Sequence, residues 1–250
     1  MRLINIGCSF SYGNCISEYE TFSDKHVSPG TIVAEHLGCE EVNLASPGLS
    51  LDGVLRRLHS FNFERQDKFL IGLPPNVRMQ YVSKVPRNQN KIRQSDPSGK
   101  GASEYRNNAF NRGPKIPQDW FKTMRWDLDF THKKIDVVET TAYWSYFYIT
   151  LIQQTMKHML STHGWQQRYW LYNSVHGHMQ QESDIPEVQQ LQDRIVLDTY
   201  YQPTKGILDL SSTTSKYRVA HDDTHPNHTC YHAWAKDFIE WTERESSSVY

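Results

Sequence analysis

The chain has 250 residues, enough to bury a sizeable core as one α/β domain. Its 27 basic and 28 acidic residues give a formal net charge of −1, so no overall field would collect nucleic acid or an anionic membrane. The apolar run at the N-terminus is too short for a signal peptide, and no window reaches the roughly 20 apolar residues of a membrane span. The four cysteines show no C-x-x-C spacing. These features predict a cytoplasmic protein that binds neither nucleic acid nor membranes.

The first third of the chain alternates short apolar strands with helices, which is typical of a parallel sheet covered by helices. Ser50 is a suitable N-cap for one of these helices, and Gly38 is a typical helix stop. The pattern predicts strands at Arg2–Ile6, Glu41–Leu44 and Phe69–Leu73, and helices at Thr31–Leu37 and Leu51–Phe61.

Residues 83–117 differ from the rest in composition. This stretch is rich in Asn, Gln, Ser, Gly and Pro and shows neither a helical nor a strand period. It carries eight basic and two acidic residues, a local excess of six positive charges. We predict an irregular insertion, which is a solvated loop, a lid that attracts an anionic substrate, or a docking arm for a partner.

The second half returns to regular patterns. It predicts helices at Ile135–Leu160, Glu187–Asp193 and His228–Thr242, and strands at Arg168–Tyr172 and Gly206–Leu210. We find no internal repeat and expect a single domain over residues 1–250. Aromatic residues crowd the segment from Trp120 to Tyr172, where they serve packing or form a surface that stacks on carbohydrate.

Three short motifs follow predicted strands or lie near the C-terminus. The first, Gly7-Cys8-Ser9-Phe10-Ser11-Tyr12-Gly13, places a serine at a glycine-flanked turn that can expose its hydroxyl. The second runs from Asn43 to Gly48, and Gly48 can bring its backbone N–H close to a substrate carbonyl oxygen. Because the carboxyl ends of parallel strands meet at one edge, we expect these motifs to lie close together.

The third motif is Asp222-Asp223-Thr224-His225-Pro226-Asn227. A carboxylate three residues before a histidine can accept a hydrogen bond from its Nδ1–H and leave Nε2 to take a proton from a serine. Asp223 is one residue too close for that pattern, and we assign it an outer supporting role.

Together the three motifs resemble the conserved blocks of the SGNH, or GDSL, hydrolase family. The first motif is similar to that family's Gly-Asp-Ser block with Cys8 in place of the acidic residue, and Asp222, His225 and Pro226 match its Asp-x-x-His-Pro block. The resemblance implies a flavodoxin-like, three-layer α/β/α sandwich with a mainly parallel five-stranded sheet. It also implies a serine esterase with Ser9 as nucleophile, His225 as base and Asp222 as its orienting partner, which uses no cofactor.

The family's third block departs from the pattern in this chain. An asparagine is expected directly after the third strand, where its side chain would complete an oxyanion hole with the N–H groups of Ser9 and Gly48. Here Pro74 takes that position, and Asn76 lies two residues late. Asn76 is therefore a weak candidate for the hole. Arg78 is a second candidate, although a surface cation is its simpler interpretation.

The sequence is also compatible with other functions. His221, His225, His228 and His232 suggest a metal site, but His225 is already explained by Asp222 and Pro226, so we expect no metal. His176 and His178 have less context and are interpreted as loop residues. The chain could also be an SGNH-fold binding module with little turnover, a type of sequence that bacterial viruses encode, or an O-acyltransferase that uses the same serine. The leading substrate is a small acyl ester, with an acetyl group on a carbohydrate as the first choice.

Overall fold

The computed structural model describes residues 1–13, 27–75, 78–87, 119–125, 137–162, 169–173, 183–201, 207, 218–220 and 223–247. In chain order its elements are β1 (Arg2–Ile6), α1 (Ser9–Tyr12), α2 (Pro29–His36), β2 (Glu40–Asn43), α3 (Leu51–Ser60), β3 (Lys68–Leu73), β4 (Arg78–Arg87), β5 (Asp119–Arg125), α6 (Val137–Thr162), β6 (Tyr169–Asn173), α7 (Pro186–Asp193), the 3₁₀ helix η3 (Leu197–Thr199), β7 (Tyr200–Tyr201), β8 (Arg218–Ala220), β9 (Asp223–Pro226) and α9 (His228–Ser247).

Five strands form the main sheet in the order β2-β1-β3-β6-β7, and each neighbouring pair is parallel. Counted along the chain, this order is 2-1-3-4-5, which is the flavodoxin-like arrangement. The predicted fold class is therefore confirmed. In this arrangement the chain reverses its direction of progress between β1 and β3, and such a switch point opens a crevice at the carboxyl ends of the strands.

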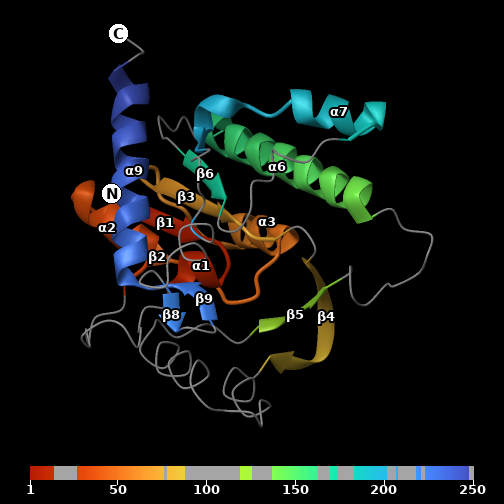
Figure 1. The fold of residues 1–250 in the computed structure, drawn as a ribbon, viewed down its shortest axis with the longest axis horizontal. Coiled ribbons are helices and arrows are strands. Elements are labelled where there is room, and N and C mark those ends of the chain that lie inside the picture. Colours follow the sequence, from red (N-terminus) through yellow and green to blue (C-terminus); the bar gives the residue numbers. More distant parts are fainter. Residues whose placement is uncertain are drawn as a thin grey trace.

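Helices cover both faces of the sheet. Figure 1 shows α2 and α9 on one side and α3, α6 and α7 on the other. The central strands are apolar because both of their faces are covered, and the side chains of Leu3, Ile4 and Ile6 in β1 and of Phe69, Leu70 and Ile71 in β3 are fully buried. The core therefore lies along β1 and β3 and supports the edge from which the first motif begins.

The predicted strands and helices of the first third agree with the structure to within two residues. Gly38 ends α2 with a φ of +62°, a left-handed conformation that glycine adopts without strain. At the start of the same helix the Ser28 hydroxyl accepts from the Thr31 N–H. This N-cap was not identified from the sequence. Ser50 occupies the N-cap position of α3, but its hydroxyl binds the Asp52 carboxylate instead of a backbone N–H.

Two predictions for the rest of the chain need correction. The fifth strand of the sheet is Tyr200–Tyr201, whereas the sequence predicts it at Gly206–Leu210; of that range only Ile207 is described, in a helical conformation, and the rest lies outside the described residues. The insertion does not begin as irregular chain at residue 83, because β4 continues to Arg87 and pairs with β5 in an antiparallel hairpin. Residues 88–117, the rest of that prediction, lie outside the described residues.

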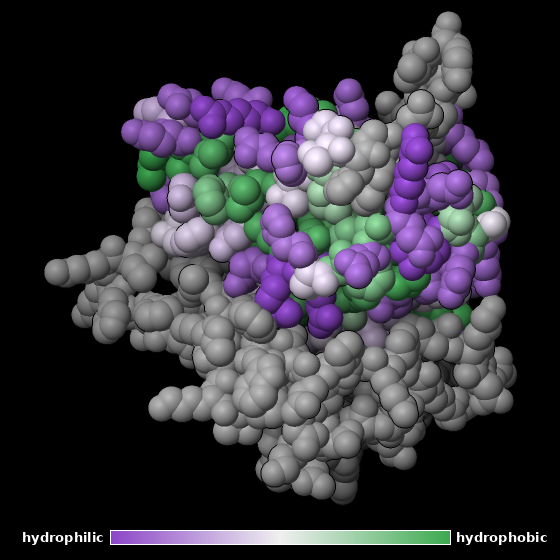
Figure 2. All heavy atoms as spheres, turned by 180° about the vertical axis from the view of Figure 1, so that it is seen from behind, coloured by the Kyte–Doolittle hydropathy of each residue, from purple (hydrophilic) through white to green (hydrophobic). Residues whose placement is uncertain are grey.

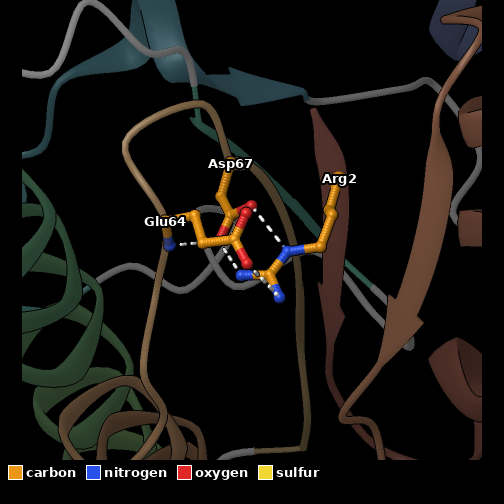
Figure 3. A network of polar contacts seen from close by, with 3 residues as sticks. All are labelled: Arg2, Glu64 and Asp67. Carbon is orange, nitrogen blue, oxygen red and sulfur yellow. Dashed lines mark hydrogen bonds and ion pairs between the residues drawn. The ribbon is translucent and has the colours of Figure 1, made fainter.

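An ion pair at the amino edge of the sheet joins β1 to the turn before β3. Arg2 donates from Nε and Nη2 to the two carboxylate oxygens of Asp67, at 2.9 and 2.7 Å, and its Nη1 lies 3.0 Å from Glu64. Figure 3 shows the three side chains converging, with the Glu64 backbone N–H also donating to Asp67 at 2.7 Å. This two-pronged geometry is strong for an arginine and a carboxylate, and it fixes where both central strands begin.

The described surface is mixed in character. Seen from behind, hydrophilic residues in purple lie among hydrophobic ones in green (Figure 2). The exposed large hydrophobic residues of the described part are Met1, Tyr143, Ile185, Val196 and Leu197. Among the described helices, none combines the length and the apolar character that a bilayer crossing requires.

Candidate active site

Ser9 begins α1 directly beyond the carboxyl end of β1. The one-turn helix closes because the N–H groups of Ser11 and Tyr12 both donate to the Cys8 carbonyl, at 3.1 and 2.9 Å. A strand that turns at once into a helix presents its first residues at the sheet edge. The structure thus places Ser9 beside the switch point, where open α/β sheets form their binding crevice.

His225 reaches the same place from the other end of the chain. It lies on β9, which pairs with β8 in a short antiparallel hairpin. Its Nε2 atom is 3.1 Å from the Ser9 Oγ atom, although 216 positions separate the two residues. The ring also stacks on Phe10, with centroids 5.0 Å apart and planes 16° apart. The Phe10 ring therefore supports one face of the imidazole and holds it facing Ser9.

The contact between Ser9 and His225 has the geometry of a nucleophile and its base. A hydroxyl within 2.6–3.2 Å of an imidazole nitrogen can pass its proton to that nitrogen while its oxygen forms a new bond. This requires the tautomer in which Nδ1 carries the proton and Nε2 accepts. The two side chains selected from the sequence are thus within hydrogen-bond distance of each other.

The second motif is joined to the first by backbone and side-chain hydrogen bonds. The Ser46 N–H donates to the Gly7 carbonyl at 2.9 Å, and the Asn43 side chain donates to the Tyr12 carbonyl at 3.1 Å. Gly48 adopts a φ of +77°, the left-handed conformation that favours glycine. The loop that carries Gly48 is therefore held against the turn that carries Ser9.

Several predicted site residues are not settled by the structure. Asp222 and Asn76 lie outside the described residues, and Asp223 is described only as the first backbone position of β9. Arg78 begins β4 and is half-buried, and its Nη1 atom is buried without a hydrogen-bond partner. This burial differs from the simple surface cation that the sequence favours.

The histidine-based metal hypothesis finds no cluster in the described part of the chain. Among those residues, no group of three His, Cys, Asp or Glu side chains gathers closely enough to hold an ion. His228 and His232 lie one turn apart on α9, while His221, His176 and His178 fall outside the described residues.

Comparison with known proteins finds likeness in structure and none in sequence. No family model and no curated protein matches the sequence. Two solved chains match the fold. One is a carbohydrate esterase, described as having an active site with divergent catalytic and non-catalytic binding functions. It shares 12% identity and a TM-score of 0.46 with this chain, and the match covers 97% of this chain and 64% of the esterase chain. The chain thus spans less than two thirds of the matched structure.

Sequence reasoning missed a buried contact beneath the Ser9 turn. Tyr172, on β6, donates from its phenol to the Ser11 Oγ atom at 2.7 Å, and neither side chain is exposed. Burial raises the pKa of Tyr172 above its ordinary value, which keeps the phenol protonated as a donor. The partners are 161 positions apart, so no local pattern connects them. The glycines around the contact are its only signal in the sequence.

A second missed group lies under the same turn. The buried Asn5 side chain on β1 donates to the Ser11 carbonyl at 2.8 Å and to the Glu41 carboxylate at 2.8 Å. Glu41 also accepts from the hydroxyls of Ser28 and Thr31, at 2.5 and 2.7 Å. Burial raises the pKa of the Glu41 carboxyl, and these hydrogen bonds oppose the rise. The network links the start of α2 and the edge strand β2 to the Ser9 turn.

Proposed function

We propose that this chain is a serine esterase in which Ser9 is the nucleophile and His225 is the general base. The observation that carries the proposal is the 3.1 Å contact between Ser9 Oγ and His225 Nε2 at the carboxyl edge of the sheet. A serine is a weak nucleophile unless an adjacent base takes its proton. Two chain segments that meet only through folding supply this pair.

The reaction has two halves. Ser9 Oγ attacks the ester carbonyl carbon while its proton passes to His225 Nε2, and the tetrahedral intermediate then expels the alcohol, which receives that proton. Water, deprotonated by the same nitrogen, attacks the acyl-serine, and the second tetrahedral intermediate expels Ser9 Oγ, which takes back that proton as the acid is released. Asp222 is the proposed partner of Nδ1 that holds the required tautomer, and Phe10 supports the imidazole ring from one face.

The oxyanion of the intermediate needs donors that are already in position. We assign this role to the backbone N–H groups of Ser9 and Gly48, with Asn76 as the third donor. The left-handed Gly48 and the hydrogen bond from Ser46 to Gly7 support the assignment, because they hold the Gly48 loop beside the turn. The resemblance to the SGNH family assigns the same positions. On this proposal residues 1–250 form one domain of that family.

The proposed substrate is a small acyl ester, an acetyl group on a carbohydrate. Many aromatic residues of the middle segment serve packing, since Tyr146, Trp170 and Tyr172 are buried. A second group on the first half of α6 forms a cluster of contacting rings, and Tyr143 at its edge is exposed. The four rings are those of Tyr143, Trp144, Phe147 and Tyr148. Because α6 precedes the parallel strand β6, its first half lies toward the carboxyl edge, and its rings could stack on sugar there.

Hydrolysis of p-nitrophenyl acetate by the purified protein tests the proposal. We expect turnover by the wild type and its loss in Ser9→Ala and His225→Ala. Ser145→Ala, which truncates a buried serine on α6, and His59→Ala, at an exposed position on α3, are the matched controls and should keep full activity. A folded wild type without turnover would contradict the esterase and favour a binding module. If the acetyl group is instead transferred to an added sugar and little free acetate is released, the protein is an acyltransferase.

A further inference from the structure

Ser11 is held from two strands at once. Its hydroxyl accepts from the Tyr172 phenol on β6, and its carbonyl accepts from the Asn5 amide on β1. The residue is fully buried and lies two positions after Ser9 in a helix of only four residues. A displacement of Ser11 in so short a helix moves Ser9 with it.

The space for the Tyr172–Ser11 contact exists because two nearby residues have no side chain. A Cβ added to Gly7 or to Gly72 would lie 2.1 Å from the Ser11 Oγ atom. A Cβ on Gly72 would also lie 2.7 Å from the Tyr172 phenol oxygen. Gly7 precedes the nucleophile by two positions, and Gly72 lies on the neighbouring strand β3. Glycine at both positions thus leaves the space in which the Tyr172 phenol and the Ser11 hydroxyl meet.

We propose that Tyr172 is a positioning residue for the Ser9 nucleophile, acting through the Ser11 hydroxyl. The inference rests on the proposed esterase function. The hydrogen bond from the phenol fixes the α1 turn in the position at which Ser9 Oγ lies 3.1 Å from His225 Nε2. Without that contact the Ser11 side chain loses its link to β6, while Asn5 and Asn43 still bind the carbonyls of Ser11 and Tyr12, and the distance between nucleophile and base is less well defined. Small misplacements of reacting groups are costly because the rate depends on a near-attack geometry.

The chain offers a matched control in Tyr200 on the neighbouring strand β7. Its phenol also donates to a buried polar side chain, the Asn173 Oδ1 atom, and Tyr200 is as deeply buried as Tyr172. No hydrogen bond described for Tyr200 reaches the α1 turn. Replacement of either tyrosine by phenylalanine removes one buried phenol and keeps the ring. Only Tyr172→Phe removes a contact to the nucleophile turn.

The experiment compares kcat and KM for p-nitrophenyl acetate in the two variants. We expect Tyr172→Phe to lower kcat by about 10- to 100-fold and to leave KM within about twofold, because geometry of the chemical step is affected and ground-state binding is not. Tyr200→Phe should keep the wild-type kcat. Equal kcat values in the two variants, or a change in KM alone, would overturn the proposal.

A double variant separates positioning from general stabilisation. In Tyr172→Phe/Ser11→Ala both partners are apolar, so no unpaired buried group remains and thermal stability recovers relative to Ser11→Ala. We expect kcat of the double variant to stay as low as that of Tyr172→Phe, since the hydrogen bond between β6 and the turn is still absent. A kcat that recovers together with stability would show that the contact serves folding only, and would overturn the positioning role.

A third measurement does not depend on turnover. Amide hydrogen exchange at Ser11 and Tyr12 should be faster in Tyr172→Phe than in Tyr200→Phe, because their N–H groups close the α1 turn onto Cys8. If the wild type hydrolyses no ester, the proposed function fails, and the exchange result still decides whether Tyr172 holds the turn. Equal exchange in the two variants would contradict the proposed contact itself.

Discussion

At the start of β1, Arg2 binds the Asp67 carboxylate through two nitrogens, whereas beyond its other end the chain turns and brings the Ser9 hydroxyl to His225. The first arrangement pairs a cation with an anion and satisfies both within the protein. The second brings a hydroxyl and an imidazole together, a pair that can exchange a proton. One strand therefore carries a structural contact at its amino end and, on the proposed function, a reactive one at its carboxyl end.

The comparison extends to the residues beneath each site. The amino-edge pair is built from the strand, the turn before β3 and one exposed carboxylate, Glu64. The carboxyl-edge site needs a short helix held from below by Asn5 and Tyr172, with glycines where groups approach closely. Changes at the first site should alter stability alone, while changes at the second should alter rate.

The largest expected effect is a difference in kcat between variants of the two aspartates before His225. Asp222→Asn should lower kcat for p-nitrophenyl acetate by up to about 10⁴-fold, because an amide no longer fixes the productive tautomer of the histidine. Asp223→Asn should change kcat far less. The steady-state kinetics of the two variants, measured side by side, assign the orienting carboxylate. A larger loss in Asp223→Asn would move that role to Asp223.

The next effect lies at the amino edge. Asp67→Asn should lower the free energy of unfolding by about 2–3 kcal/mol, since it leaves the Arg2 guanidinium without its buried anion. Glu64→Gln, which alters an exposed partner of the same arginine, should cost less than about 1 kcal/mol. Urea denaturation measures both. The kcat of folded Asp67→Asn should equal that of the wild type, and a loss of rate would break the division between the two edges.

A smaller change tests the space beneath the Ser9 turn. Gly72→Ala places a Cβ against the Ser11 hydroxyl and the Tyr172 phenol, and should cost about 1–3 kcal/mol of stability together with a lower kcat. Gly38→Ala is the control, because its φ of +62° is strained for alanine while no atom lies within 4 Å of the added Cβ. That variant should lose stability and keep its rate. Unchanged kcat in Gly72→Ala would show that the turn tolerates the displacement.

The smallest effect is a pH dependence at Glu41. Its pKa is raised in the folded state, so the folded protein binds the proton more tightly than the unfolded chain does. The contribution of this group to stability is therefore present below its ordinary pKa and is lost as the pH rises through the raised value. Glu41→Gln does not titrate. The stability of the wild type relative to this variant should fall as the pH rises above the ordinary glutamate pKa, as measured by urea denaturation over a pH series. A flat difference would contradict the raised pKa.

The parts of the fold that the sequence predicted are those with strong local signals. Apolar runs marked β1 and β3 because both faces of these strands are buried, and Gly38 marked the end of α2. The edge strand β7 has only two residues, too few to form a pattern, and the run Gly206–Leu210 beside it in the sequence carries the stronger strand signal. The β4–β5 hairpin was missed because its strands are joined through a polar, basic stretch that shows no alternation.

The site divides in the same way. Ser9 and His225 were found because each lies in a motif whose spacing has a chemical reason, and their contact then follows from the topology. Tyr172, Ser11, Asn5 and Glu41 were not found, because their roles depend on contacts between distant segments. In a sequence, a tyrosine within an apolar strand is interpreted as a core residue, because the hydrogen-bond partner of its phenol is known only from the fold. Only the small residues Gly7 and Gly72 pointed to a close approach at that place.

The account depends most directly on the reactivity of the Ser9 hydroxyl. A fluorophosphonate probe reacts with a serine that an adjacent base activates, and peptide mass mapping identifies the modified residue. The account predicts one adduct, on the peptide that carries Ser9, with labelling greatly slowed in His225→Ala and unchanged in Ser145→Ala. A folded protein that takes up no probe, or that is labelled at another serine, would contradict the assignment of Ser9 and His225 as nucleophile and base.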